Sequence, residues 1–424
     1  MKINSPDDFD NLSYIGAITE LEPASGPFAS ICPPTYANDG AKSWSDKLAI
    51  TDEMTIPSRD QNWSDVLRDG DGCPRKARAV LVNSLAAEAH HLGQILINDS
   101  GVDWGRIAVN PPNSASVEDH IQKLLEKVPA DDTVRDVVRE MLSTHGYDSW
   151  KASHRLADAS IRYATDPATG SQVWKRDSGL RGSIQSVDPG RDVDWLWCHA
   201  ANALIFGFWL SITGNGVNPK WARALSSEVF GYGVSLLRTG ATKGSELGPV
   251  SNEFKTSVDA NGELCLGEKK KAVDKEKPSA FGLGQIATSA DYSAVSCEVI
   301  LRRSGISLTH LREIKSKSGQ ERAIVRAAAA ASTYALAVVS KRNLFLRSGT
   351  DLFPVSTVWT ARTVDGSTTT LEVEVEQAKK VLETAMNDLD KVGLPQVTIG
   401  LTMSPELLRL FTDSYVSAPK GDIN

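Results

Sequence analysis

Three segments of the sequence combine cationic residues with glycines, small polar residues and aromatic rings. Phosphate groups need cations and backbone N–H groups, glycine lets the main chain approach, and exposed bases stack on aromatic rings, so these segments suit a strand of single-stranded RNA. Segment 214–237 contains Lys220, Trp221 and Arg223, segment 277–288 contains Lys277, Ser279, Gly282 and Gly284, and segment 343–354 contains Arg347 and Ser348. Each arginine could instead form a structural ion pair, and the two glycines could merely form a turn.

Motifs of common enzyme classes are absent from the sequence. The stretch 282–287 matches a degenerate G-x-G-x-x-A, but Lys277-Pro278-Ser279 precedes it instead of a buried strand, which argues against a dinucleotide site. Residues 240–245 have the wrong order and spacing for a phosphate-binding loop. His90 and His91 are adjacent on an expected helix and point about 100° apart, so they cannot grip one metal together. We therefore expect no metal, no cofactor and no catalytic residue.

The charge is acidic in total but unevenly distributed. The formal net charge is −7 and the pI is about 5.6, so any nucleic-acid site must be local. Residues 1–72 hold 5 Lys/Arg against 13 Asp/Glu, whereas residues 301–350 hold 10 against 2. Such asymmetry suits a subunit that docks its acidic part on a neighbour's basic part, or that reserves one face for phosphates. Ordinary solvated faces would give the same pattern.

Cysteine usage and hydropathy indicate a cytoplasmic protein without a membrane segment. The five cysteines are scattered with no C-x-x-C pair, which favours reduced thiols over a zinc site or a disulfide framework. The first residues are acidic and lack the apolar region of a signal peptide. The most apolar run, 198–212, is too short to span a bilayer and predicts a buried core helix.

Hydrophobic periodicity predicts strands and helices that are interspersed without a clean βαβ repeat. We expect strands over 14–21, 295–301, 370–375 and 396–402, and a hairpin in 257–267 around Asn261-Gly262. We expect helices over 76–97, 320–342 and 375–392, and a last helix that begins at Ser404-Pro405-Glu406. Segments 267–278 and 417–424 are expected to be mobile. The first is rich in lysine and could reach over a nucleic-acid strand, or be an ordinary solvated loop.

Several blocks occur in an order that resembles one known family. They read KARAVLVNSLAAEAHHL, SHRLADASIRY, HAANALIFGFWLS, PKWARALSSEVFGYGV, KPSAFGLGQIATS, SLTHLRE and AAAAASTYALAVVSKRNLFLRSGTDLFPV. They occur in this order between about residue 75 and residue 356. This succession resembles the RAMP-superfamily backbone subunit of type I-G (formerly I-U) CRISPR Cascade.

The resemblance implies an α+β fold. Its core would be an RRM-like (ferredoxin-like) antiparallel sheet, the palm, packed on helices and elaborated by insertions that form fingers and a thumb. A single domain would cover residues 1–416, with a helical insertion at about 98–180, a thumb or hairpin region at about 240–290, and a flexible tail at 417–424.

The resemblance also implies a function: a non-catalytic protein that binds crRNA. Copies of the chain would stack in a helical filament along the guide RNA and present it to a target DNA strand. Other Cascade subunits would join this filament. The complex would recruit a separate helicase-nuclease. Carried over by position, the RNA contacts are His154, Arg155, Lys220, Trp221, Arg223, Lys277, Ser279, Gly282, Gly284, Arg347 and Ser348.

Two other classes stay open at this point. One is an RNA-guided endoribonuclease backbone subunit that cuts with a loop aspartate, for which Asp177, Asp192 and Asp351 lie in suitable loops. The other is a metabolic α/β enzyme, which would have a discrete small-molecule pocket and no bound RNA.

Overall fold

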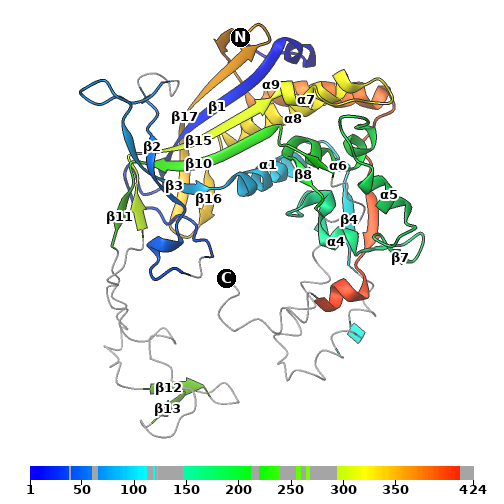
Figure 1. Cartoon of the computed structure of the whole chain (residues 1–424), viewed down its shortest axis with the longest axis horizontal. Helices are drawn as coiled ribbons and strands as arrows, with labels where there is room; N and C mark the ends of the chain where they lie inside the picture. The colour runs from blue at the N-terminus through cyan, green and yellow to red at the C-terminus, as the bar shows by residue number, and fades with distance from the viewer. Residues whose placement is uncertain are drawn as a thin grey trace.

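The computed structural model describes residues 1–37, 40–59, 65–111, 118–119, 122, 147–211, 219–238, 255–258, 264–267 and 294–410. Its largest unit is an eight-stranded antiparallel sheet with the order β16-β17-β1-β15-β10-β3-β2, and β18 pairs with β17 (Figure 1). The strands are β1 (Leu12–Pro23), β2 (Ile50–Thr55), β3 (Lys76–Asn83), β10 (Leu225–Tyr232), β15 (Val299–Ser307), β16 (Leu344–Arg347), β17 (Thr350–Thr363) and β18 (Thr368–Thr370).

Four central strands and two helices make a ferredoxin-like core. In chain order the core is β1, α1 (Leu85–Asp99), β10, β15, α8 (Glu321–Val339) and β17, which is a βαββαβ succession. Numbered one to four along the chain, its strands lie side by side in the order four, one, three, two, and all neighbours are antiparallel. The predicted fold class, an RRM-like α+β palm with insertions, is therefore confirmed.

Insertions surround this core. A five-stranded sheet has the order β5 (Tyr147–Asp148), β4 (Ile107–Asn110), β19 (Ile399–Thr402), β6 (Thr165–Asp166) and β7 (Ser171–Gln172). Two-stranded pairs are formed by β8 (Phe208–Trp209) with β9 (Lys220–Trp221), β11 (Ser235–Leu237) with β14 (Ala294–Ser296), and β12 (Lys255–Val258) with β13 (Leu264–Gly267). The remaining helices are η1 (Pro6–Asn11), η2 (Ser45–Lys47), η4 (Arg155–Ala157), α4 (Ala159–Arg162), α5 (Gly179–Gln185), α6 (Asp194–Phe206), α7 (Leu308–Leu311) and α9 (Val375–Lys391).

The insertions overlap the two regions expected from the sequence. The described part of 98–180 contains four short strands, β4 to β7, besides short helices. The region 240–290 contains the β12–β13 hairpin, which Figure 1 draws apart from the main sheet. Their roles as finger and thumb stay predictions.

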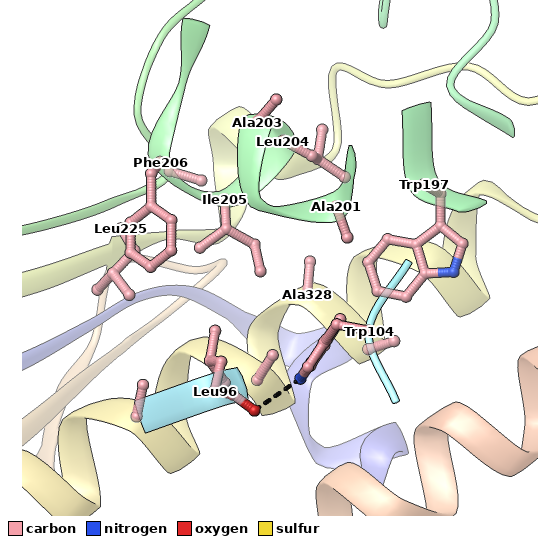
Figure 2. Close-up of a cluster of buried hydrophobic side chains, with 14 of the residues drawn as sticks. Leu96, Trp104, Trp197, Ala201, Ala203, Leu204, Ile205, Phe206, Leu225 and Ala328 are labelled. Atoms are coloured by element: carbon pink, nitrogen blue, oxygen red, sulfur yellow. Dashed lines mark hydrogen bonds between the residues drawn. The ribbon is translucent and has the colours of Figure 1, made fainter. Parts of the chain in front are cut away.

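The core lies between the palm sheet and its helices. Alternate residues of β1, such as Ile15 and Ala17, point to the helical layer and are buried. The alanines Ala327–Ala331 of α8 are almost fully buried, so this helix packs closely against its neighbours. Figure 2 shows side chains of α6 packing toward Leu96 of α1 and Ala328 of α8. Helix α8 is long and apolar enough to cross a membrane, yet 83% of its most apolar 18-residue window is buried within the protein.

Most predicted elements are confirmed, including the strand at 14–21 and the helices at 320–342 and 375–392. The hairpin predicted over 257–267 is also present, because its two strands pair, and its turn lies outside the described residues. The predicted strand 396–402 is shorter, as β19. The last helix begins after Ser404, whose Oγ accepts the Leu407 N–H at 3.2 Å.

Four predicted boundaries were wrong. The helix expected over 76–97 begins at Leu85, because residues 76–83 form a strand that pairs with both β10 and β2, and Ser84 then caps the helix. No strand forms over 371–374, since β18 ends at Thr370 and α9 begins at Val375. The strand expected over 295–301 is two strands, β14 and β15. The core helix expected over 198–212 ends at Phe206, where Gly207 adopts a φ of 76°.

Part of the charge asymmetry is neutralised within the chain. Asp10 of η1 accepts hydrogen bonds from Arg322 and Arg326 of α8. The hydrogen bond from Arg326 holds the pKa of Asp10 well below its usual range, although burial opposes the shift. Arg312 Nη2 donates to three carbonyls of the N-terminal segment, at 2.7 to 2.9 Å. These cations of 301–350 therefore bind the acidic N-terminal segment of the same chain.

A buried ion pair joins the two layers of the palm. Glu88 of α1 and Arg302 of β15 are 0% and 1% exposed, and Arg302 Nε donates to Glu88 Oε2 at 3.0 Å. Asn83 and Ser227 also donate to the Glu88 carboxylate, at 2.6 and 2.8 Å. Arg302 Nη1 donates to the carbonyl of Val339 at the end of α8, at 2.9 Å. One carboxylate thus binds groups from β3, β10 and β15.

Removing one partner of this pair should destabilise the protein strongly. In Glu88→Ala, Arg302 keeps its buried charge without a counter-ion, so we expect a loss of roughly 3–5 kcal/mol, measured by denaturant unfolding. The double variant Glu88→Leu/Arg302→Met should recover most of that loss. Lys2 and Glu372 form an ion pair with both side chains about two-thirds exposed, and Lys2→Ala is the control, with a change under about 1 kcal/mol. A small effect of Glu88→Ala would contradict this account.

Candidate nucleic-acid interface

A cleft opens where α1, the segment 150–155 and the end of α6 meet. It has a volume of about 420 Å³. Its polar and aromatic lining consists of Ser84, His90, His91, Trp150, Lys151, Ser153, Arg155, Asn202, Phe206 and Arg223. This cleft, called the α1–α6 cleft below, brings together arginines from two segments that the sequence singled out, 153–158 and 219–225. No carboxylate belongs to its lining among the described residues.

Arg155 is held rigidly at the wall of the α1–α6 cleft. Its backbone has a φ of 51°, an uncommon value for a residue other than glycine. Its Nη1 donates to the Gly207 carbonyl at 2.9 Å, and its guanidinium lies 5.5 Å from the centre of the Phe206 ring. Burial and the nearby positive charge of Arg223 lower the pKa of Arg155 to about 10. Arg155 therefore stays charged at neutral pH, close to the positive charge of Arg223.

The described residues supply no carboxylate counter-ion to either guanidinium. No ion pair joins Arg155 or Arg223 to a carboxylate in the described part of the chain. Two unpaired cations at one concave site favour an anion that bridges them, and phosphate is the anion that arginine binds with two parallel hydrogen bonds.

Gly207 allows the two arginine segments to come together. It ends α6 with φ 76° and ψ 162°, a region of backbone space that is essentially restricted to glycine. A Cβ at this position would lie 2.8 Å from the Trp221 carbonyl oxygen and 3.0 Å from the Arg223 nitrogen. The close approach of residues 221–223 to the end of α6 thus depends on the missing side chain.

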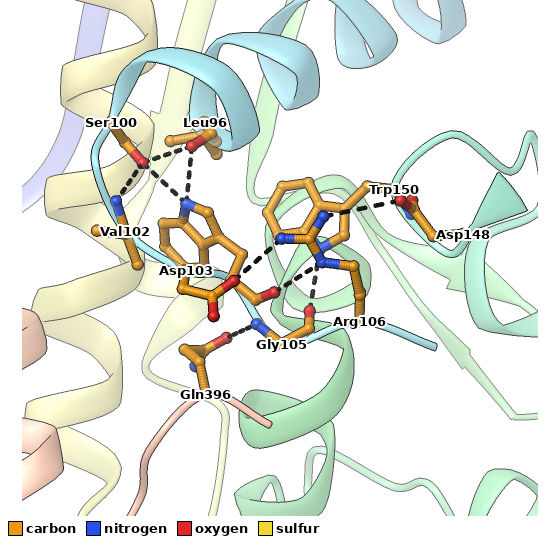
Figure 3. A network of polar contacts seen from close by, with 10 residues as sticks. Leu96, Ser100, Val102, Asp103, Gly105, Arg106, Asp148, Trp150 and Gln396 are labelled. Carbon is orange, nitrogen blue, oxygen red and sulfur yellow. Dashed lines mark hydrogen bonds and ion pairs between the residues drawn. The ribbon is translucent and has the colours of Figure 1, made fainter. Parts of the chain in front are cut away.

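A network of polar contacts fixes the floor of the cleft (Figure 3). Trp150 Nε1 donates to the Gly105 carbonyl at 3.0 Å, and the Trp150 N–H donates to Asp148 Oδ1 at 2.8 Å. The Gly105 N–H in turn donates to Gln396 Oε1 at 3.0 Å. A Cβ on Gly105 would lie 1.9 Å from the Cys198 carbonyl oxygen, so only glycine fits against α6 there. Hydrogen bonds to Gly105 and to Asp148 of the five-stranded sheet therefore fix the position of Trp150.

A second cavity lies on the face of the palm sheet that α1 and α8 do not cover, and it is called the sheet-face cavity below. It has a volume of about 340 Å³, and Arg223 lines it too. Tyr14 of β1 is 40% exposed there and lies over Gly16 and Gly305, whose added Cβ atoms would meet its ring at 2.8 Å or closer. Burial raises the pKa of Tyr14, although Arg303 and Arg362 oppose the shift. An aromatic ring beside arginines on an open sheet face is suited to base stacking.

The other predicted site residues lie in several places. Lys220 is exposed on β9, and Trp221 stacks on His310 with ring centres 4.2 Å apart. His154 is exposed, and its N–H donates to Asp158 Oδ2 at 3.3 Å. Lys277, Ser279, Gly282 and Gly284 lie outside the described residues.

Arg347 and Ser348 lie at the edge strand β16 and line neither cavity. Arg347 is half-buried and donates to the Cys32 carbonyl at 3.1 Å. The structure therefore brings Arg155 and Arg223 into one cleft, and it does not bring Arg347 to them.

Sequence reasoning missed four side chains of these cavities: His91, Asn202, Tyr14 and Arg303. His91 lines the α1–α6 cleft, and burial lowers its pKa, although Glu88 opposes the shift. Asn202 lay within a quoted block, and Tyr14 and Arg303 lay in strands, but periodicity cannot tell which face of a sheet stays open. Only the arrangement of the elements reveals these four.

The described residues offer little for metal or carboxylate chemistry. They contain no group of three His, Cys, Asp or Glu that could hold a metal ion. Asp192 pairs with Lys317 at 2.8 Å, Asp177 is exposed in a turn, and Asp351 lies on β17. None of these three aspartates lines the α1–α6 cleft or the sheet-face cavity.

The fold and this cleft define a ferredoxin-like α+β protein with a local cationic site on an acidic chain. Residues 16–236 match the family model described as CRISPR-associated protein GSU0053, and the chain belongs to this family. Among solved structures it is similar to a chain of a "CRISPR RNA-guided surveillance complex, pre-nicking", at 10% sequence identity and a TM-score of 0.30, over 95% of this chain and 99% of that chain. No curated protein matches the sequence.

Substituting Gly207 should disturb the contact between α6 and residues 221–223. We expect Gly207→Ala to destabilise the protein by about 1–3 kcal/mol, because alanine is strained at this backbone conformation and its Cβ meets the Trp221 carbonyl. Gly182→Ala in α5 is the matched control, since its Cβ would have no neighbour within 4 Å and alanine favours a helix. Thermal or denaturant unfolding measures both variants, and equal stabilities would contradict the role given to Gly207.

Proposed function

We propose that this protein is the crRNA-binding backbone subunit of a type I-G Cascade complex. The observation that carries the proposal is the pair of guanidinium groups in the α1–α6 cleft, Arg155 and Arg223, which no carboxylate neutralises among the described residues. Family membership places the chain among CRISPR-associated proteins. The sequence blocks that supply both arginines are those that resemble the backbone subunit.

Electrostatics supports a polyanion at this position. Two like charges in a partly desolvated cleft raise the free energy of the protein, as the lowered pKa of Arg155 reflects. A phosphate between them would remove this repulsion and form charge-assisted hydrogen bonds. A net charge of −7 disfavours binding by bulk attraction, so the RNA would be held by local cations such as Arg155 and Arg223.

The position of Arg223 suggests a course for the strand. Arg223 lines both the α1–α6 cleft and the sheet-face cavity, so a single strand could run from one to the other past this side chain. Tyr14 would then stack on a base, with Arg303 near the backbone. The protein would bind the phosphates of the guide RNA, and base pairing between the guide and the target strand would determine the sequence specificity.

In this proposal the protein binds and does not cut. Several copies would follow one guide as a helical filament in the cytoplasm, and other Cascade subunits, the target DNA strand and a helicase-nuclease would be partners.

Removing the two cations should reduce the salt dependence of RNA binding. Each neutralised phosphate contributes about −0.7 to the slope of log K against log salt for a single strand, so Arg155→Gln/Arg223→Gln should make the slope shallower by up to about 1.4. Affinity for a short RNA would be measured at several salt concentrations. Lys341→Ala/Lys380→Ala is the control of equal charge, since both lysines are exposed and line neither cavity. An unchanged slope in the arginine variant would remove this cleft from the RNA site.

A cleavage assay tests the non-catalytic role. We expect no cleavage of a complementary RNA when the assembled complex is incubated with Mg²⁺ and analysed on a denaturing gel. Regularly spaced cuts would favour the endoribonuclease alternative. If cuts appear, Asp177→Asn, Asp192→Asn and Asp351→Asn would then identify the residue responsible.

A further inference from the structure

We propose that Trp209 and Lys220 form a second RNA-binding subsite beside the α1–α6 cleft, in which the Trp209 ring stacks on a base and Lys220 binds a neighbouring phosphate. This inference rests on the proposed function, because it extends the path of the same strand. It adds a base contact outside both cavities, where the proposed function rests on the two arginines.

The first observation is a large aromatic side chain that lies in solvent. Trp209 of β8 is 63% exposed, although its neighbours along the chain, Phe208 and Leu210, are 6% and 1% exposed. Tryptophan is highly buried on average in folded proteins, so a ring of this size is uncommon at the surface. The indole is therefore directly accessible to a ligand.

The pairing of β8 with β9 places Lys220 beside this ring. Trp209 is paired directly with Lys220, and Phe208 is paired with Trp221. Residues that lie opposite each other on paired strands point to the same face. The β8–β9 pair therefore has an inner face, with Phe208 buried and Trp221 half-buried, and an exposed face with Trp209 and Lys220.

The exposed face of the β8–β9 pair lies close to the α1–α6 cleft. Phe206, which lines the cleft, precedes Trp209 by three residues. Arg223, which also lines it, follows Lys220 by three residues. Three residues of extended chain span at most about 11 Å. A strand whose phosphates lie at Arg223 can therefore bring a nearby base to Trp209.

The carboxylates near Lys220 are paired with other cations. Lys220 shares a cavity with Asp188 and Asp192. Asp188 pairs with Arg191 at 3.3 Å, and Asp192 pairs with Lys317 at 2.8 Å. Three cations and two carboxylates leave one net positive charge, so the exposed ammonium of Lys220 can attract a phosphate.

A ring beside a cation suits a single-stranded nucleic acid better than it suits a protein partner. Bases stack on exposed aromatic rings with little regard to sequence, and a cation beside the ring binds the backbone. The cores of protein–protein interfaces are enriched in tryptophan but depleted of lysine. Lys220 on the same face as Trp209 therefore favours RNA as the occupant.

Removing the ring tests the stacking contact. For a short RNA that binds one copy of the protein, Trp209→Ala should lower the affinity by about 5- to 100-fold, the usual effect of losing one stacked base. Because the ring is uncharged, the slope of log K against log salt should stay that of the wild type, whereas Lys220→Gln should make it shallower by about 0.7. An unchanged affinity of Trp209→Ala for this RNA would overturn the inference.

Phe28→Ala is the matched control for the loss of an exposed ring. Phe28 is 72% exposed, and it lines a cavity together with Glu22, whose carboxylate disfavours RNA. We expect this variant to bind RNA like the wild type, and thermal unfolding would verify that both variants are folded. A loss of affinity as large as that of Trp209→Ala would contradict the role given to Trp209.

A strand without bases identifies the group that the ring contacts. An abasic ribose-phosphate strand of the same length keeps its phosphates but cannot stack. Trp209→Ala and the wild type should bind this strand equally, so the effects of removing the ring and of removing the bases are coupled. An equal loss of affinity for both strands would overturn the stacking contact.

The remaining outcomes separate this inference from its alternatives. If Trp209 contacts a neighbouring copy of the protein, Trp209→Ala weakens binding only to RNA that holds several copies, and the inference is overturned. If Trp209→Ala binds short RNA normally while Arg155→Gln/Arg223→Gln shows a shallower salt slope, the proposed function is supported and only the Trp209 subsite is lost. An unchanged slope in the arginine variant would count against the proposed function itself.

Discussion

The buried ion pair between Glu88 and Arg302 is the contact on which the arrangement of the palm depends. A lone charge at either position would be costly inside the protein, so both side chains must meet, and their meeting fixes α1 against β15. Arg302 also reaches the last carbonyl of α8, so the same charge sets the position of the second core helix. One face of α1 is thereby anchored to the sheet, while His90 and His91 next to Glu88 line the cleft.

The α1–α6 cleft results from close backbone approaches at its edges. Gly105 lies against the Cys198 carbonyl, and Gly207 lies against residues 221–223. These contacts place Arg155 and Arg223 close enough to repel each other, although 67 residues separate them in the sequence. Two cations held together without a counter-ion from the described residues favour the binding of an anionic ligand. This explains how a chain with a net charge of −7 can have a local cationic site.

The sequence predicted the fold better than it predicted the site. Long, strongly periodic segments such as those of α8 and α9 were predicted to within a few residues, because a buried stripe at helical spacing has one stable solution. The segment 76–83 was assigned to a helix in error, since its short apolar run fits a buried strand equally well and pairing with β10 decides between them. The excess of cations in 301–350 left open a docking face, a phosphate-binding face or an ordinary solvated face, and the structure shows that two of these cations, Arg322 and Arg326, bind Asp10 of the same chain.

The sequence by itself determined the class of fold, the family resemblance, the local nature of any cationic site, and two of the arginines that line it. These properties depend on composition, periodicity and short blocks, which are local along the chain. The tertiary structure alone decided that Arg155 and Arg223 share a cleft, that Arg347 lies apart from them, and that Asn202 has a buried oxygen without a partner among the described residues. Those properties depend on which backbone groups meet across the fold, and a buried acceptor is recognised only when all of its neighbours are known.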